Sequence, residues 1–206
     1  MKRRNIFFIY ELVQVLYQYL KMIHLLIKNK LGGQRLLQSL IKIIILKIKY
    51  GKHIQINITK RISLLSIFRI KDGTISFGRG FGVKKGTQIA ANGGAVHIGK
   101  GVNFNYNCMC VSYRLITIGD DCSFGPNVCI YDHDHAFNSN GKIRGEFKSS
   151  DVIIENNVWI GANSVILRGS HIGANSVIGA GCIIKGYIPA NSLIIQKRET
   201  IISTLE

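Results

Sequence analysis

Two histidines, at positions 133 and 135, stand in the polar segment YDHDH. A neutral imidazole takes up a proton near pH 7, so each is a candidate general base, with a surface-loop histidine as the alternative. Alternate residues of an extended segment also share one side, which would suit a metal ion. Because no third ligand follows at a recognisable spacing, we expect no metal.

The histidines interrupt a regular repeat. Isoleucine recurs every six residues from Ile154 to Ile184, glycine follows it at 161, 173 and 179, and the fourth residue after it is small or β-branched. The register reaches back, with shifts of phase, to Phe77. Between Ile130 and Ile154 it gives way to a polar stretch, and such a break in a regular coil usually carries function. We therefore keep both histidines of this segment as candidate catalytic residues.

The repeat predicts the element that positions these residues. Each hexad forms a short strand and a turn, and three hexads form one triangular coil of about 18 residues. Adjacent coils cover one another's backbone edges, so both ends need caps. We expect an all-β parallel β-helix over residues 73–195 with a loop at 131–151, a largely helical extension over 1–72 and a tail over 196–206.

The N-terminal extension carries most of the net charge of +16. Residues 1–72 hold 15 of the 27 lysines and arginines but only Glu11 and Asp72 as acids, which leaves +13. These cations alternate with apolar runs and no nucleic-acid motif appears, so we expect no nucleic acid.

Two apolar patterns in the extension indicate helices. Leu12, Leu16, Tyr19, Ile23 and Leu26 define one helical face, and a second run covers 36–50. Two roles remain open for residues 1–50: peripheral contact with an anionic membrane, or a cap on the first coil or on a neighbouring subunit.

The five cysteines contain no C-x-x-C, and four of them fall in register with the repeat. We interpret Cys108, Cys110, Cys122 and Cys182 as reduced, structural side chains. The first 22 residues form neither a good signal peptide nor a good membrane span. We expect a cytoplasmic protein, peripheral at the inner face of the membrane if the extension binds lipid.

Three ordered stretches carry a specific resemblance: VNFNYNCMC (102–110), IGDDCSFGPNVCIYDHDH (118–135) and residues 152–194. Together they resemble the maltose, galactoside and capsular-polysaccharide O-acetyltransferases of the hexapeptide-repeat family. The resemblance implies a left-handed β-helix, acetyl-CoA as donor and a sugar or polysaccharide-precursor acceptor. It also implies a homotrimer whose active sites lie between subunits, and transfer without a covalent enzyme intermediate.

The resemblance also implies roles for single residues. His135 matches the family's general base, whereas His133 has no matched position in the family and stays a second candidate. Asn105 matches the asparagine beside the acceptor, with a turn-forming role as its alternative. The Ala162 backbone N–H would hold the oxyanion. Trp159 would line the CoA channel, with core packing as its alternative. The remaining CoA contacts would be Gly161, Gly179, Ala180 and Lys185.

Two departures from the family pattern affect acceptor and donor contacts. Ser112 stands where the family often has an aspartate, and residues 196–200 read QKRET in place of the usual G-N-P-A-K. Other acceptors, namely a free sugar, an amino sugar, serine or an antibiotic, fit the same residues. A non-catalytic β-helix and a carbonic-anhydrase-like metal enzyme are the alternatives from other classes.

Overall fold

The computed structural model describes residues 33–56, 61–139 and 141–197, together with positions 13, 17, 20, 21, 199 and 202. Most of the expected first helix, including Leu12 and Leu26, lies outside these residues. The described chain begins with helix α2 (Gly33–Tyr50) and a short 3-10 turn, η1 (Gly51–His53). No helix within the described residues has both the length and the hydropathy needed to cross a membrane.

Apart from one antiparallel hairpin, the described strands that follow form three parallel sheets, which we name A, B and C. Sheet A contains β1 (Ile54–Ile56), β4 (Thr74–Phe77), β7 (Ala95–Ile98), β10 (Leu115–Ile118), β15 (Val152–Ile154), β18 (His171–Ile172) and β21 (Tyr187–Ile188). Sheet B contains β2 (Arg61–Ile62), β5 (Gly82–Val83), β8 (Asn103–Phe104), β11 (Ser123–Phe124), β16 (Trp159–Ile160), β19 (Val177–Ile178) and β22 (Leu193–Ile194). Sheet C contains β3 (Ile67–Lys71), β6 (Gln88–Asn92), β9 (Met109–Ser112), β12 (Cys129–Tyr131), β17 (Val165–Ile166) and β20 (Ile183–Ile184).

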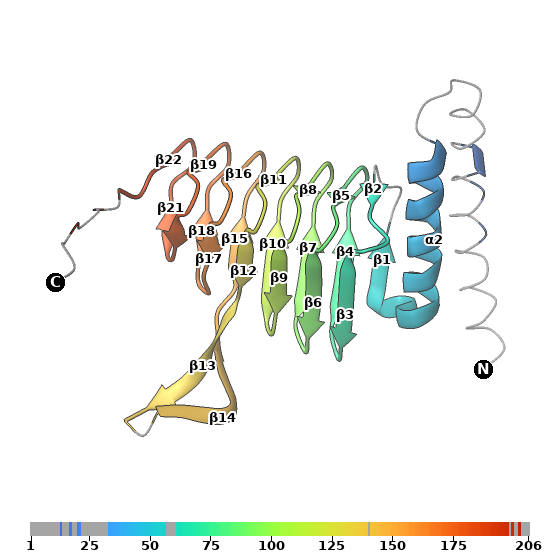
Figure 1. Ribbon diagram of the computed structural model, residues 1–206. Helices are drawn as coiled ribbons and strands as arrows, with labels where there is room; N and C mark the ends of the chain where they lie inside the picture. Colours follow the sequence, from blue (N-terminus) through green and yellow to red (C-terminus); the bar gives the residue numbers. More distant parts are fainter. Residues whose placement is uncertain are drawn as a thin grey trace.

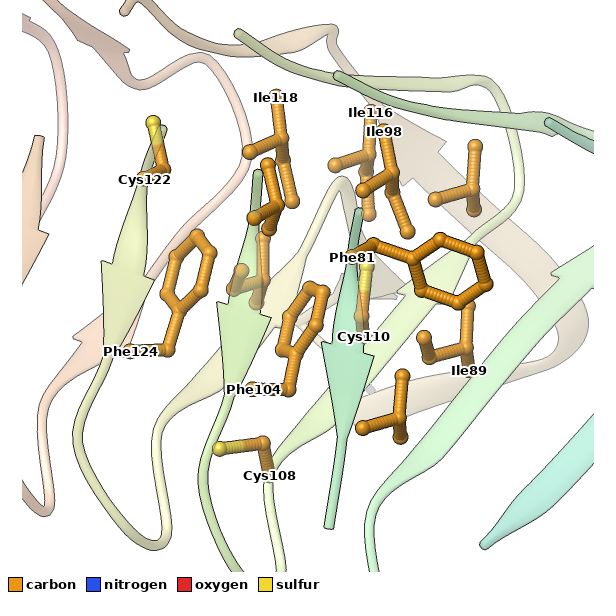
Figure 2. Packing of buried hydrophobic residues seen from close by; sticks show 14 of the residues in the cluster. Phe81, Ile89, Ile98, Phe104, Cys108, Cys110, Ile116, Ile118, Cys122 and Phe124 are labelled. Atoms are coloured by element: carbon orange, nitrogen blue, oxygen red, sulfur yellow. The ribbon is translucent and has the colours of Figure 1, made fainter. Parts of the chain in front are cut away.

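Successive strands along the chain belong to different sheets, so the backbone winds as a triangular prism (Figure 1). The aliphatic position of each hexad stacks on its counterpart one coil away, as Ile118 does on Ile154 and Ile154 on Ile172. These side chains fill the prism, where the Phe104 and Phe124 rings stack with centroids 4.6 Å apart (Figure 2). The parallel β-helix predicted from the repeat, and the left-handed form that the resemblance implies, are confirmed.

Asparagines build several corners of the prism. Asn127, Asn157, Asn163 and Asn175 all adopt the left-handed backbone region, with φ between 56° and 59°. Asparagine enters this region more readily than most residues. Their amides form ladders along the corners: Asn127 Nδ2 donates to Asn163 Oδ1, and Asn157 Nδ2 to Asn175 Oδ1, both at 3.0 Å. The hexad corners are therefore fixed by polar as well as apolar side chains.

Helix α2 caps the N-terminal end of the prism (Figure 1). Its inner face buries Leu40, Ile43 and Leu46 in the same core cluster as the coils. The Ser39 hydroxyl accepts a hydrogen bond from Ile62 N at 2.9 Å, which ties the helix to β2. A helix with such contacts covers the apolar end of the first coil, so α2 fulfils the expected capping role.

The β-helix begins earlier than expected. The domain boundary at residues 72/73 lies too far along the chain, because β1 pairs with β4 in parallel from Ile54 onwards. The hexad pattern of this first coil is irregular in sequence, and only the strand pairing reveals it.

Candidate active site

The expected loop at 131–151 is an antiparallel hairpin, which we call the arm. It consists of β13 (His133–Asn138) and β14 (Gly141–Ser149) and projects away from the prism (Figure 1). The arm leaves after β12 of sheet C and returns to β15 of sheet A, so it departs from the C/A corner. His135 is exposed on β13, and its ring lies 4.8 Å from that of Phe147 on the opposite strand.

Asp132 anchors the base of the arm. Its fully buried carboxylate accepts hydrogen bonds from Ser112 Oγ at 2.7 Å and from the backbone N–H groups of Tyr113 and Arg114, both at 2.8 Å. It also contacts His133 Nδ1 at 3.1 Å. Burial alone raises the pKa of Asp132, but the hydrogen bonds from His133, Tyr113, Ser112 and Arg114 outweigh it and lower that pKa below 3.8. The carboxylate is therefore ionised at neutral pH.

Two further contacts fix the arm's first strand. The His133 ring packs against the ring of Tyr113, with centroids 4.1 Å apart, and its side chain is only 14% exposed. Arg168, in the next coil, donates through Nε to Asp134 Oδ2 at 2.5 Å. His133 is thus held between the arm and the coil, whereas His135 faces solvent.

Asn105 and Trp159 lie on another face, where they line one groove of about 260 Å³ on sheet B. The Asn105 carboxamide oxygen accepts hydrogen bonds from Lys84 Nζ at 3.0 Å and from Tyr106 N at 2.9 Å. Trp159 is 56% exposed, which excludes core packing as its role. Asn105 does bond to neighbouring backbone, as its turn-forming alternative requires, but its side chain also borders the groove.

A row of small residues continues from Asn105 along one corner of the prism. Asn105, Gly125, Gly161 and Gly179 each follow a strand of sheet B, and the backbone N–H of each bonds to the next coil. A Cβ at Gly125 would lie 2.6 Å from Ala162 N, and one at Gly161 would lie 2.5 Å from Ala180 N. Glycine at both positions is thus required by the close approach of neighbouring coils. We call this row the glycine track.

Lys185 is not on the glycine track. It follows β20 of sheet C and lies at the C/A corner, the same corner from which the arm departs. The chain therefore carries the predicted site residues in two separate groups. His135 and Lys185 belong to the C/A corner, whereas Asn105, Trp159, Gly161, Ala162, Gly179 and Ala180 belong to sheet B and the corner that follows it.

The cysteines behave as packing residues. Cys108, Cys110, Cys122 and Cys182 are buried, and Cys129 is partly buried. Burial raises the pKa of the Cys122 thiol to about 11 and also raises the pKa values of Cys108 and Cys110. Within the described chain, no group of three histidine, cysteine, aspartate or glutamate side chains gathers as metal ligands.

Comparison with known proteins identifies the family. The sequence model of "Bacterial transferase hexapeptide (six repeats)" matches residues 151–186. The putative lipopolysaccharide biosynthesis O-acetyl transferase WbbJ of Escherichia coli is 32% identical over 133 residues, which cover 60% of this chain and 68% of WbbJ. The chain belongs to the hexapeptide-repeat acetyltransferase family. The galactoside O-acetyltransferase of Lactococcus lactis is 42% identical over 96 residues, 47% of this chain and 46% of that protein.

The matches differ in how much of each protein they cover and in whether they compare sequence or fold. The chain spans about half the length of several of the curated relatives that it matches. Among solved structures, a mutant of AntD, an N-acyltransferase from Bacillus cereus, in complex with dTDP and coenzyme A, superposes with a TM-score of 0.61. The match covers 73% of this chain and 82% of AntD at 19% identity, which supports the fold.

Sequence reasoning missed the residues that hold the arm. Asp132 and Arg168 were not singled out, because their partners lie 18 to 20 and 34 residues away in sequence. Lys84 and Arg61, which line the groove beside Asn105, were also missed. The one signal available was the hexad register, which aligns Lys84 with Asn105 once the phase shift between their coils is known.

Proposed function

We propose that the chain transfers an acetyl group from acetyl-CoA to a sugar hydroxyl of a bacterial surface polysaccharide or its precursor. The observation that carries this proposal is the continuous row from Asn105 along Gly125, Gly161 and Gly179. It joins a groove whose polar side chains, among them Asn103, Asn105 and Ser123, can bind sugar hydroxyls to a row of small residues suited to an extended thioester. The family relationship to WbbJ supports the polysaccharide branch.

The glycine track is our proposed site for the pantetheine arm of acetyl-CoA. Gly125 and Gly179 are partly exposed and have no side chain, so a ligand can approach their backbone closely, whereas Gly161 between them is buried against the next coil. The exposed face of Trp159 would form one wall, and Ala180 would border the track. The thioester would then lie beside Ala162, whose backbone N–H would stabilise the oxyanion of the tetrahedral intermediate.

His135 is our proposed general base. Its imidazole would remove the proton from the acceptor hydroxyl as the oxygen attacks the thioester carbonyl carbon. When the tetrahedral intermediate collapses, the carbon–sulfur bond breaks and the imidazolium returns the proton to the leaving thiolate. Asn105 would orient the hydroxyl. The reaction balances with acetyl-CoA and acceptor alone, and it needs neither a metal ion nor a covalent enzyme intermediate.

We propose a homotrimer in which the arm of one subunit reaches the groove of its neighbour. The separation of the two groups of site residues supports this, since the arm leaves the C/A corner and the groove lies on sheet B. Lys185 shares the arm's corner, so it would contact CoA bound to the neighbouring subunit. Closed cyclic assemblies join different surfaces of adjacent subunits in this manner.

Subunit complementation tests the proposed acetyl transfer and the proposed inter-subunit sites together. His135→Ala and Asn105→Ala are each expected to be inactive in CoA release against a panel of sugars. Refolded 1:1 mixtures should regain about one quarter of wild-type activity, because a quarter of inter-subunit sites then combine two intact halves. No recovery would contradict shared sites. Mass spectrometry identifies the products. Absence of CoA release and of acetylated product with the wild type would contradict the proposed acetyltransferase activity and favour a non-catalytic β-helix.

We also propose that α2 contacts an anionic membrane at the cytoplasmic face. Its outer side exposes an apolar stripe made of Leu37, Ile41, Ile45 and Ile48. The +13 charge of residues 1–72 complements an anionic leaflet, where each cation near the surface contributes about 1 kcal/mol. Lipid-linked polysaccharide precursors reside at such a surface, so this contact would bring the groove to its acceptor.

A further inference from the structure

The groove on sheet B changes character along its length. Its outward residues on five successive strands are Arg61, Gly82, Asn103, Ser123 and Trp159. Lys84 occupies the adjoining corner row, one coil before Asn105, because its backbone N–H bonds to the Phe104 carbonyl. The cations therefore lie at the end opposite Trp159 and the glycine track.

Both charged residues that line the groove are cations. Among the described residues, no salt bridge joins Arg61 or Lys84 to a carboxylate. Lys84 Nζ lies 4.8 Å from the centroid of the Tyr106 ring and donates to Asn105 Oδ1. An ammonium group has three donors, so Lys84 keeps capacity for a second acceptor.

Gly82 lines the cationic end and leaves room there for the Asn103 side chain. A Cβ at Gly82 would lie 2.7 Å from Asn103 Oδ1, in the space between Arg61 and Asn103. The polar groups that remain around this end are the side chains of Asn103, Asn105 and Ser123. The combination of two cations with neutral polar groups and no carboxylate is suited to an oxyanion attached to a sugar.

We propose that the acceptor carries an anionic group, a phosphoryl or a carboxylate, which binds between Arg61 and Lys84 while its reacting hydroxyl lies at Asn105. This inference rests on the proposed acetyl transfer. Neighbouring strands are about 4.8 Å apart, so the rows of Lys84 and Arg61 lie about 5 and 10 Å from that of Asn105. A hexose with a phosphoryl group on its anomeric carbon, or a uronic acid, spans that interval.

The test compares acceptors that differ only in charge. Each sugar of a panel is offered to the full-length enzyme as its methyl glycoside, its 1-phosphate, its nucleoside diphosphate form and its uronic acid. CoA release gives kcat and KM, and calorimetry in the presence of CoA measures binding without turnover. We expect one anionic form to be preferred by about tenfold or more in kcat/KM, and which form it is distinguishes phosphoryl from carboxylate.

Substitutions assign the preference to the groove. Arg61→Gln should remove most of the preference by raising the KM of the anionic acceptor while the KM of acetyl-CoA stays unchanged. Lys84→Met should do the same and also lower kcat, because it loses its bond to Asn105. The matched controls are Arg69→Gln, exposed on sheet C, and Lys85→Met, exposed outside the groove. Both should keep the wild-type preference.

The outcomes distinguish the proposed anionic acceptor from the proposed acetyl transfer. Transfer with equal kcat/KM to neutral and anionic forms overturns the anionic acceptor and leaves acetyl transfer standing. An increase in the KM of acetyl-CoA in Arg61→Gln would assign the cations to CoA instead, which also overturns it. Tight, Arg61-dependent binding of an anionic form without transfer supports the groove but contradicts the proposed function. Neither binding nor transfer with any form contradicts both.

Discussion

The Nδ1 atom of His133 lies 3.1 Å from Oδ1 of the buried carboxylate of Asp132. Since an ionised carboxylate only accepts hydrogen bonds, this nitrogen carries a proton. The pair lies where the arm leaves the coil, and the same carboxylate binds the corner formed by Ser112, Tyr113 and Arg114. Asp132 therefore connects the start of the arm to the preceding coil, and the direction of the arm depends on this connection.

Removing this carboxylate is expected to destabilise the protein. Asp132→Ala leaves the backbone N–H groups of Tyr113 and Arg114 without an acceptor, so we expect a loss of about 2–4 kcal/mol in unfolding free energy. Urea denaturation measures it. The control is Asp151→Ala, which breaks a surface ion pair with Arg114 and should cost less than about 1 kcal/mol. Equal losses for the two variants would show that Asp132 is not the anchor.

The pKa of Asp132 gives a pH dependence with a defined sign. Because its folded pKa lies below the ordinary value of 3.8, the folded state binds fewer protons than the unfolded state in acid. Its stabilising contribution is complete above the unfolded pKa and disappears as the pH falls through the folded pKa. Between about pH 5 and 3, the Tm of the wild type should therefore fall more steeply than that of Asp132→Asn. Parallel curves would contradict this assignment.

The cysteines are expected to differ in reactivity. Cys129 is partly exposed, whereas the other four are buried and three of these have raised pKa values. Alkylation proceeds through the thiolate, so the native protein should take up one label quickly, at Cys129. After denaturation all five thiols should react. Peptide mass spectrometry locates the label, and rapid native labelling of Cys110 would be inconsistent with the packing.

The sequence allowed the fold to be predicted because the repeat is local. The spacing of Ile154 to Ile184 specifies strand, corner and interior position within six residues, and the structure confirms it. The first coil, which begins at Ile54, was not predicted because its hexads are irregular. The contacts of Asp132, Arg168 and Arg61 escaped because they join residues one coil apart or more, and single-sequence patterns do not report such contacts.

The proposed membrane contact must be tested with variants that keep the core intact. Deleting residues 1–50 would remove Leu40, Ile43 and Leu46 from the core, so unfolding is expected and the deletion is uninformative. Replacing the exposed residues Ile41, Ile45 and Ile48 with serine should instead leave Tm nearly unchanged.

The serine variant should bind less to phosphatidylglycerol vesicles in sedimentation assays, and wild-type binding should weaken as salt rises. The control replaces the exposed Leu64 and Leu65, which lie between β2 and β3. If the wild type fails to sediment with these vesicles at low salt, α2 is a cap alone.

Turnover by His135→Ala is the most direct test of the account. Loss of a general base should lower kcat by about 100-fold or more, while calorimetric CoA binding and Tm stay close to wild type. His133→Ala should lower Tm and activity but keep the wild-type pH profile of kcat. His97→Ala, an exposed histidine on sheet A, should change neither kcat nor Tm. Full turnover by His135→Ala would contradict the account.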